Sequence, residues 1–352
     1  MIKLTTARMG AFAAVAMAAV LAACSTPEPP PPPAPPPPPP PPAINLSSQL
    51  FEEASAWRIY MAKATAISPE FSDAAGVASS LRIGASYEPR QFIRGAISYA
   101  AVIALQDQTF VSNVRVYAAD PVARQQLAAE LLSNPNRVAS LPGADRAAGL
   151  VVAALGGEGA KVLTNGRNIK MSAYGVQKQK WSRDFVPNRD GRLVDVRTLS
   201  TSAYRGDIEE VSRMQLASLG GGLPTGPEGL IGQEVAQPWT PVVVRGLALA
   251  ALAALGEAGD DRIASLQPLL QDEPSYFCLN MSKLMLFQCL AAAKPHYEDV
   301  FCLGQHALID TGQCTIKIAG APMPIEPPPP VNMAASKPPA AKPAAKAAAK
   351  KK

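Results

Sequence analysis

Proline is concentrated at the two ends of this chain, and that distribution limits where a folded domain can form. Fourteen of the sixteen residues from Pro27 to Pro42 are proline, and a second cluster, Pro327 to Pro330, lies near the C-terminus. Proline fixes its φ angle and lacks an N–H donor, so polyproline II is the only regular conformation for the first run. At about 3.1 Å per residue this run predicts a stiff spacer of about 50 Å. Its alternative role is a ligand for an aromatic groove.

The residues between the two ends are rich in alanine and leucine, and their apolar residues recur at helical spacing. Leu50, Ala54, Trp57 and Met61 predict a first amphipathic helix. No hairpin series or alternating strand pattern competes with this period. The sequence therefore predicts an all-α domain over residues 43–320, built as a helical array or bundle. Further helices are expected from Ser68-Pro69-Glu70 onward and over residues 90–105, 122–132, 145–155, 241–255 and 262–270.

Glycine patterns leave the organisation of this domain open. Ala153-Ala154-Leu155-Gly156 is matched by Ala253-Ala254-Leu255-Gly256, and each is expected at the end of an apolar helix. The match indicates either a duplicated helical unit or a chance similarity between alanine-rich helices. Gly220 to Gly222 begin a long loop, so the domain either divides near residues 219–240 or continues as one array. No Gly-Lys-Ser/Thr sequence follows them, which excludes a phosphate-binding loop of that type.

The first 24 residues have the pattern of an export signal. Lys3 and Arg8 precede an apolar run over residues 11–23, which is short for a membrane-spanning helix. Leu21-Ala22-Ala23-Cys24 closes the run and resembles the lipobox of bacterial lipoprotein precursors. The alternative is an ordinary cleaved signal beside an unmodified cysteine. The resemblance implies a signal peptide over residues 1–23 and a mature chain that starts at Cys24 and is held on a membrane by acyl chains on that residue.

The resemblance covers only this segment, and no family is evident for the rest of the chain. It implies a lipidated Cys24 and a proline-rich linker over residues 24–42, then the helical domain, then a disordered Pro/Ala/Lys tail over residues 321–352. Ser25 rather than aspartate follows the cysteine, which in the Gram-negative sorting pattern favours the outer membrane, facing the periplasm. The longest later apolar stretch, residues 246–255, is too short to span a bilayer, so no second membrane segment is expected.

Four cysteines follow the implied cleavage site: Cys278, Cys289, Cys302 and Cys314. An exported chain with an even, clustered set is expected to form disulfides. Cys278 and Cys289 are eleven residues apart, or about 16 Å along one helix, which is too far for a bond. An antiparallel hairpin turning at residues 294–296 would instead bring together the nested pairs 289–302 and 278–314. We therefore predict a disulfide-linked C-terminal helical hairpin, analogous in geometry to the twin Cys-x9-Cys hairpins of small oxidised helical proteins.

Candidate chemistry is sparse. His306 follows Cys302 by four residues, which allows a zinc site to be drawn, but disulfide formation consumes the thiolate that zinc needs. Glu298 and Asp299 lie beside His296, as in an acid/base group, although a solvated helix start explains the same residues. No nucleophile elbow, metalloprotease helix or nucleotide motif is present. We therefore nominate no catalytic residue, no metal ligand and no cofactor.

Two basic segments are candidate anion-binding sites. Residues 161–205 hold ten basic and three acidic residues with aromatic residues interleaved, and the densest part contains Lys178, Lys180, Trp181 and Arg183. Aromatic faces stack on sugar rings while cations meet carboxylates or phosphates; the alternative is a solvated basic helix with its aromatic residues in the core. The tail carries six cations and no acid, which predicts attraction to polyanions or simply solubility. These are Lys337, Lys342, Lys346, Lys350, Lys351 and Lys352.

The expected function is a non-enzymatic tether or scaffold of the cell envelope, anchored to a membrane through Cys24. Its expected partners are peptidoglycan or another anionic envelope polymer, or proteins; export argues against nucleic acid. Residues 43–330 hold 25 basic and 27 acidic residues, so the positive net charge comes from the two ends of the chain. The alternative is an envelope enzyme or accessory factor acting on glycan or lipid, which would be favoured by a cleft with convergent Glu, Asp or His side chains.

Overall fold

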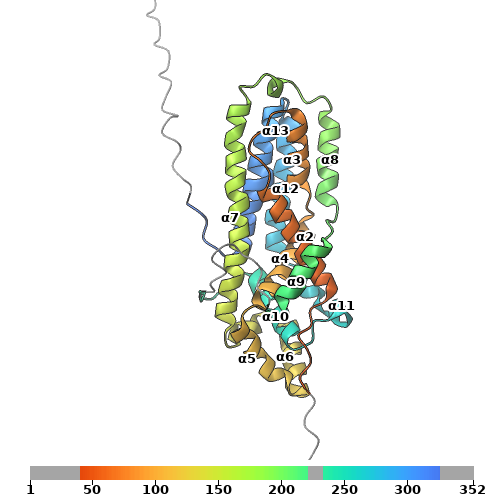
Figure 1. The fold of residues 1–352 in the computed structure, drawn as a ribbon, viewed down its shortest axis with the longest axis vertical. Coiled ribbons are helices and arrows are strands. Elements are labelled where there is room, and N and C mark those ends of the chain that lie inside the picture. The colour runs from red at the N-terminus through yellow and green to blue at the C-terminus, as the bar shows by residue number, and fades with distance from the viewer. Residues whose placement is uncertain (1–39, 221–232, 326–352) are drawn as a thin grey trace, which may run out of the picture. The chain divides into compact units, whose positions relative to one another are not determined.

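The computed structural model describes residues 40–220 and 233–325, and within these ranges the chain is helical and contains no β-strand (Figure 1). This confirms the all-α prediction. Thirteen α-helices are present in the described ranges. They are α2 (Ser48–Thr65), α3 (Ala74–Ala85), α4 (Pro89–Ala104), α5 (Gln108–Ala118), α6 (Pro121–Ser133), α7 (Ala144–Val176), α8 (Arg189–Thr201), α9 (Ile208–Ser218), α10 (Pro241–Ala254), α11 (Ile263–Leu266), α12 (Glu273–Ala292), α13 (His296–Cys302) and α14 (Asp310–Ala319). The signal segment and Cys24, most of the proline-rich linker and the lysine tail lie outside the described residues.

Side-chain caps set where most helices begin. Asp120 accepts a hydrogen bond from the amide of Val122 at 2.9 Å, and Pro121 is the first residue of α6, as the sequence predicts. The start expected at Ser68-Pro69-Glu70 is wrong. There the Ser68 hydroxyl accepts only from the Glu70 amide, at 3.1 Å, while Asp73 caps α3 by accepting from Gly76 at 2.7 Å. Ile67 and Phe71 are both buried, and a helix from Pro69 would not place them both in the core.

Helix α7 is the longest element, with 33 residues, and it does not end at Gly156 as predicted. Its glycines instead allow other elements to approach its backbone. A Cβ on Gly159 would lie 2.9 Å from the Ile316 side chain of α14, and one on Gly166 would lie 2.7 Å from the backbone nitrogen of Ile309. Gly256, by contrast, has a φ of 79° and follows the last turn of α10. The two matched motifs therefore have different local structures, which removes the observation that suggested a duplication.

The core is centred on α4 and α10. Every residue of α10 from Gly246 to Ala254 is buried, as are residues 95–104 of α4. Small side chains allow these two helices to lie in contact, and α2 packs on the other side of α4 with Trp57 stacked on Tyr99, ring centroids 5.0 Å apart. The stretch expected as one helix over residues 262–270 is a short α11 between two 3-10 turns, Asp260–Arg262 and Gln267–Leu270, because Pro268 lacks the donor that a continuous helix needs.

Among the described residues, α7 is also long and apolar enough to cross a membrane, which the sequence analysis did not anticipate. Its most apolar window is 67% buried within the fold. That burial is the environment of a core helix of a folded domain, with α14 packed along it.

The two ends of α7 lie at opposite ends of the folded unit (Figure 1). At one end, Arg115 of α5 donates to the carbonyls of Pro42 and Ala254 at 3.0 and 3.1 Å, and Ser47 donates its amide to Ala258 at 2.8 Å. The segment that follows the proline run is thereby fixed beside α5 and α10. The other end of α7 is 33 residues away, or about 50 Å at 1.5 Å per residue.

Candidate functional site

The C-terminal helices are joined by two disulfides, in the nested pairing that the cysteine spacing predicts. Cys289 of α12 bonds to Cys302 of α13, with Cα atoms 5.7 Å apart, and Cys278 of α12 bonds to Cys314 of α14, with Cα atoms 5.8 Å apart. A π-helix over Leu303–Ile309 joins α13 to α14. Because Cys302 is bonded to Cys289, it is not free to form the zinc site drawn with His306, whose Nδ1 lies 2.8 Å from Asp310 Oδ2 instead.

The basic segment singled out in the sequence forms the turn after α7. Lys178, Lys180 and Arg183 are exposed there. Trp181 is half-buried and packs near the His296 ring, with centroids 6.2 Å apart, while its Nε1 donates to Gln179 Oε1 at 2.6 Å. The cations are therefore accessible, whereas Trp181 supports the turn more than it offers a free face.

This turn is paired with the turn of the disulfide hairpin. Phe185 and Pro295 form an isolated antiparallel bridge, in which Val186 donates its amide to Lys294 at 2.9 Å. Lys294 is exposed, so the pairing adds a fourth cation to the group. We call Lys178, Lys180, Arg183 and Lys294 the basic tip.

An ion pair lies beneath the basic tip. Arg192 of α8 contacts Asp299 of α13, and the two side chains are only 10% and 3% exposed. Arg192 also reaches the carbonyl of Leu290, and Arg189 donates to the carbonyls of Ala291 and Ala293 at 2.7 and 2.9 Å, so both arginines satisfy the C-terminal end of α12. Burial raises the pKa of Asp299, an effect that the nearby Arg192 opposes. Asp299 is thus a structural partner of Arg192 and is not free for the acid/base role considered with His296 and Glu298.

A groove of about 400 Å³ runs beside the basic tip, between α7, α12 and α13. Its aromatic lining consists of Tyr174, Tyr297 and Phe301, and the Cys289–Cys302 disulfide forms part of its wall. Tyr174 is 46% exposed, so its ring is open to solvent. We call this the aromatic groove.

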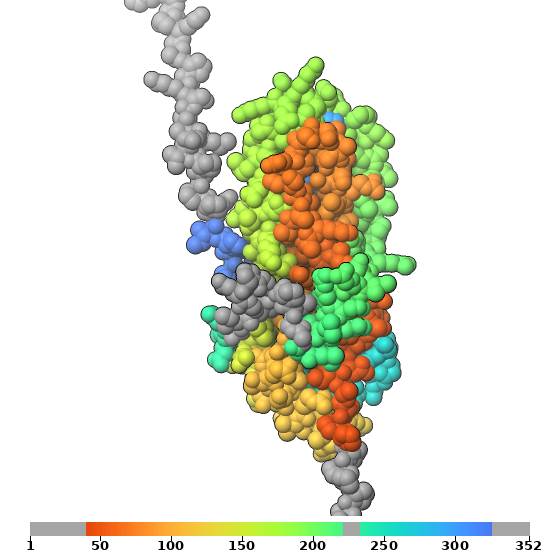
Figure 2. Space-filling view, viewed as in Figure 1, coloured from red at the N-terminus to blue at the C-terminus, as the bar shows by residue number. Residues whose placement is uncertain are grey.

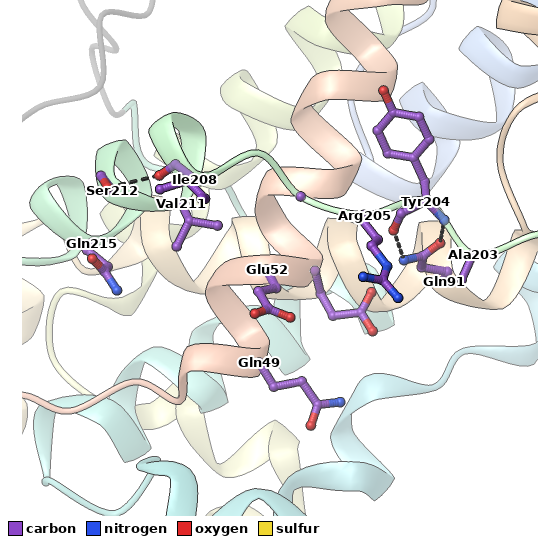
Figure 3. Close-up of a pocket in the computed structure, with 12 residues that line it drawn as sticks. Gln49, Glu52, Gln91, Ala203, Tyr204, Arg205, Ile208, Val211, Ser212 and Gln215 are labelled. Atoms are coloured by element: carbon purple, nitrogen blue, oxygen red, sulfur yellow. Dashed lines mark hydrogen bonds between the residues drawn. The ribbon is translucent and has the colours of Figure 1, made fainter.

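A second groove, of about 720 Å³, lies between α2, α4, α9 and the segment before α9 (Figure 3). Figure 2 shows α9 lying against α2 on the drawn face. The α2 wall carries Gln49, Glu52 and Glu53, Arg205 projects from the connecting segment, and Ile208 and Val211 come from α9. We call this the polar groove. The sequence analysis missed it, although Glu53 falls within the apolar face of Leu50, Ala54 and Trp57, which is the signal that could have marked it.

The floor of the polar groove is fixed by hydrogen bonds. The Gln91 carboxamide donates to the carbonyl of Tyr204 at 2.6 Å and accepts from its amide at 2.7 Å. Glu53 accepts from Arg94 at 3.0 Å, and its side chain is 11% exposed. Burial raises the pKa of the Glu53 carboxyl, while the Arg94 charge acts in the opposite direction.

No group of three or more His, Cys, Asp or Glu side chains suited to a metal ion occurs in the described ranges, 40–220 and 233–325. The tail lysines and Cys24, which the sequence nominated as sites, fall outside those ranges. No family model, no curated protein and no solved structure matches this chain.

Proposed function

We propose that this chain is a membrane-anchored lipoprotein of the cell envelope, held through acyl chains on Cys24, and that its helical domain tethers an anionic envelope polymer. The anchored end is the end of the domain that follows the proline-rich linker. The binding surface is the basic tip together with the aromatic groove. Peptidoglycan, which carries both sugar rings and carboxylates, is the polymer that this surface suits best.

The observation that carries the proposal is the position of the basic tip. The linker enters beside Pro42 and α5, whereas the basic tip follows the far end of α7, about 50 Å away along the helix. A domain anchored at one end and cationic at the other is arranged to bridge a membrane and a polymer in front of it. The lipobox resemblance supplies the anchor, and the two disulfides are typical of an exported chain.

The chemistry of the tip suits a glycan with carboxylates. Four exposed cations lie around the pairing of residues 185 and 295, and exposed side chains of Tyr174 and Phe185, 46% and 67% exposed, lie in the same part of the chain. Aromatic faces contact sugar rings, and lysine or arginine side chains form charge-assisted hydrogen bonds with carboxylates. Exposed ion pairs are individually weak, so several must act together.

Co-sedimentation with purified peptidoglycan tests this proposal. We expect the full chain to co-sediment and the triple variant Lys178→Gln/Lys180→Gln/Arg183→Gln to be retained about tenfold less or weaker still, with binding that falls as salt is raised. A matched control changes three exposed cations elsewhere, Lys63→Gln/Arg82→Gln/Arg213→Gln. Deletion of residues 331–352 measures the share of the tail separately. Equal retention of the tip and control variants would remove the basic tip from the proposal.

The polar groove is the observation that favours the second candidate, an envelope accessory factor. Within the described residues it brings Glu52 and Glu53 into one cleft, but Glu53 is engaged by Arg94. This arrangement supports ligand binding better than acid/base catalysis with paired carboxyls. Incubating the protein with peptidoglycan and assaying for released fragments tests turnover; release that is lost in Glu52→Gln would favour an enzyme over a tether.

A further inference from the structure

The polar groove contains charged side chains without partners. Within residues 40–220 and 233–325, neither the Glu52 carboxylate nor the Arg205 guanidinium forms a hydrogen bond or an ion pair, and they do not pair with each other. The carboxamides of Gln49 and Gln215 in the same groove are also without hydrogen bonds in that part of the chain. Figure 3 shows Glu52 and Gln49 projecting from α2, and Arg205 from the segment that faces them.

The groove is also preformed. The segment that carries Arg205 is held on one side by the paired hydrogen bonds between Gln91 and Tyr204. On the other side, the Ser55 hydroxyl donates to the carbonyl of Asp207 at 3.3 Å and accepts from its amide at 3.2 Å. Gly206 fits against α2 between these anchors, where a Cβ would lie 3.0 Å from the Glu52 carbonyl oxygen. A ligand entering the groove therefore does not have to order this segment, which favours binding.

The two walls differ in polarity. The α2 wall offers amide and carboxylate groups, and the α9 wall offers Ile208, which is 87% exposed, and Val211. A ligand that matches all of these features carries an ammonium group, a carboxylate, backbone-like amides and small apolar side chains. A short peptide with free ends has this combination.

We propose that the polar groove binds short zwitterionic peptides, with Glu52 receiving the ammonium group and Arg205 the carboxylate. The α9 wall contacts the apolar side chains of the peptide. The site is separate from the basic tip and does not depend on the proposed tethering function. It assigns to the domain a second ligand class, that of small peptides with free ends.

Saturation-transfer NMR with trialanine and the purified full chain tests the proposal, because this measurement detects ligands of millimolar affinity. We expect transfer to the methyl protons of trialanine, and about fivefold weaker binding for its N-acetylated form and for its C-terminal amide. Glu52→Gln should weaken free trialanine but abolish the difference caused by acetylation. Arg205→Gln should likewise abolish the difference caused by amidation.

The control variants are Glu70→Gln and Arg183→Gln, which change exposed groups outside the groove and should leave trialanine binding unchanged. The proposal is overturned if trialanine shows no saturation transfer, or if the two groove variants respond to acetylation and amidation as the unmodified chain does. Arg183→Gln also separates the two functions. Failure of the tip to bind peptidoglycan leaves the peptide result intact, and the reverse holds as well.

Discussion

The amide of Val186 donates to the carbonyl oxygen of Lys294 at 2.9 Å, and this hydrogen bond joins two segments that lie more than a hundred residues apart. One segment is the basic turn after α7 and the other is the turn of the disulfide hairpin. Their pairing places the four cations of the basic tip on covalently braced helices. The tip is therefore supported by α7, α12 and α13 together.

The two disulfides should contribute unequally to stability. Cross-linking restricts the unfolded chain more when the closed loop is longer, and the sequence separations are 36 for Cys278–Cys314 and 13 for Cys289–Cys302. Replacing the first pair by serine should lower the free energy of unfolding by about 4 kcal/mol, and replacing the second by about 3 kcal/mol. Urea unfolding of the two double-serine variants measures both. A larger loss for the shorter loop would contradict this account.

The pair Arg192–Asp299 should behave as a buried ion pair. Asp299→Asn leaves the Arg192 charge uncompensated and should lower the free energy of unfolding by about 3–5 kcal/mol. The double variant Arg192→Met/Asp299→Leu should lose much less, because neither charge remains. A double-mutant cycle by urea unfolding compares them, with the exposed pair Arg213–Glu209 as the control, for which we expect about 1 kcal/mol or less.

Glycines on opposite faces of α7 should respond oppositely to alanine. Gly166→Ala places a methyl group 2.7 Å from a backbone nitrogen of the π-helix and should destabilise by about 1–3 kcal/mol. Gly157→Ala and Gly175→Ala meet nothing within 4 Å and should stabilise by about 0.5–1 kcal/mol through helix propensity. Thermal unfolding of the three variants checks the sign of each change.

Lys283 should make stability depend on pH. Its side chain is buried, its Nζ donates to the Ala85 carbonyl at 2.7 Å and lies over the Tyr87 ring, and burial holds its pKa well below the usual range. Between that lowered pKa and the ordinary value of about 10.4, the unfolded chain binds more protons, so stability rises with pH across this window. Below the lowered pKa both states are protonated, and the full cost of burying the charge applies.

Lys283→Met should therefore be more stable than the unmodified chain at neutral pH, and the difference should shrink as the pH approaches 10. The Ala85 carbonyl still accepts from Ser200 and from the Tyr87 amide in the variant, so no acceptor is left without a partner. Urea unfolding at several pH values below 10 gives the comparison. A stability difference that does not change with pH would show that Lys283 keeps its proton in the folded chain.

Local signals in the sequence predicted the helix type and several helix starts. Asp120-Pro121 marks the start of α6 because the cap and the fixed φ of proline act within one turn. The disulfide pairing also followed from local spacing, since Cys289 and Cys302 are equidistant from the hairpin turn. These features depend on residues that are close in the chain.

The features that could not be predicted depend on contacts between distant segments. Gly156 looks like a helix end, but α14 and the residues after it pack against that part of α7, and helix α7 continues. The polar groove brings α2 together with residues about 150 positions later, through the Ser55–Asp207 contact. Neither wall has an unusual composition, so only the fold reveals the groove.

Helix α7 runs without interruption from the end where the linker enters to the basic tip. A pull exerted on the tip is therefore carried as tension along a single rod, and two covalent bonds prevent the neighbouring hairpin from being peeled open. We expect a domain built in this way to transmit mechanical load between a surface and whatever its tip holds, and to yield first at weaker joints elsewhere in the chain.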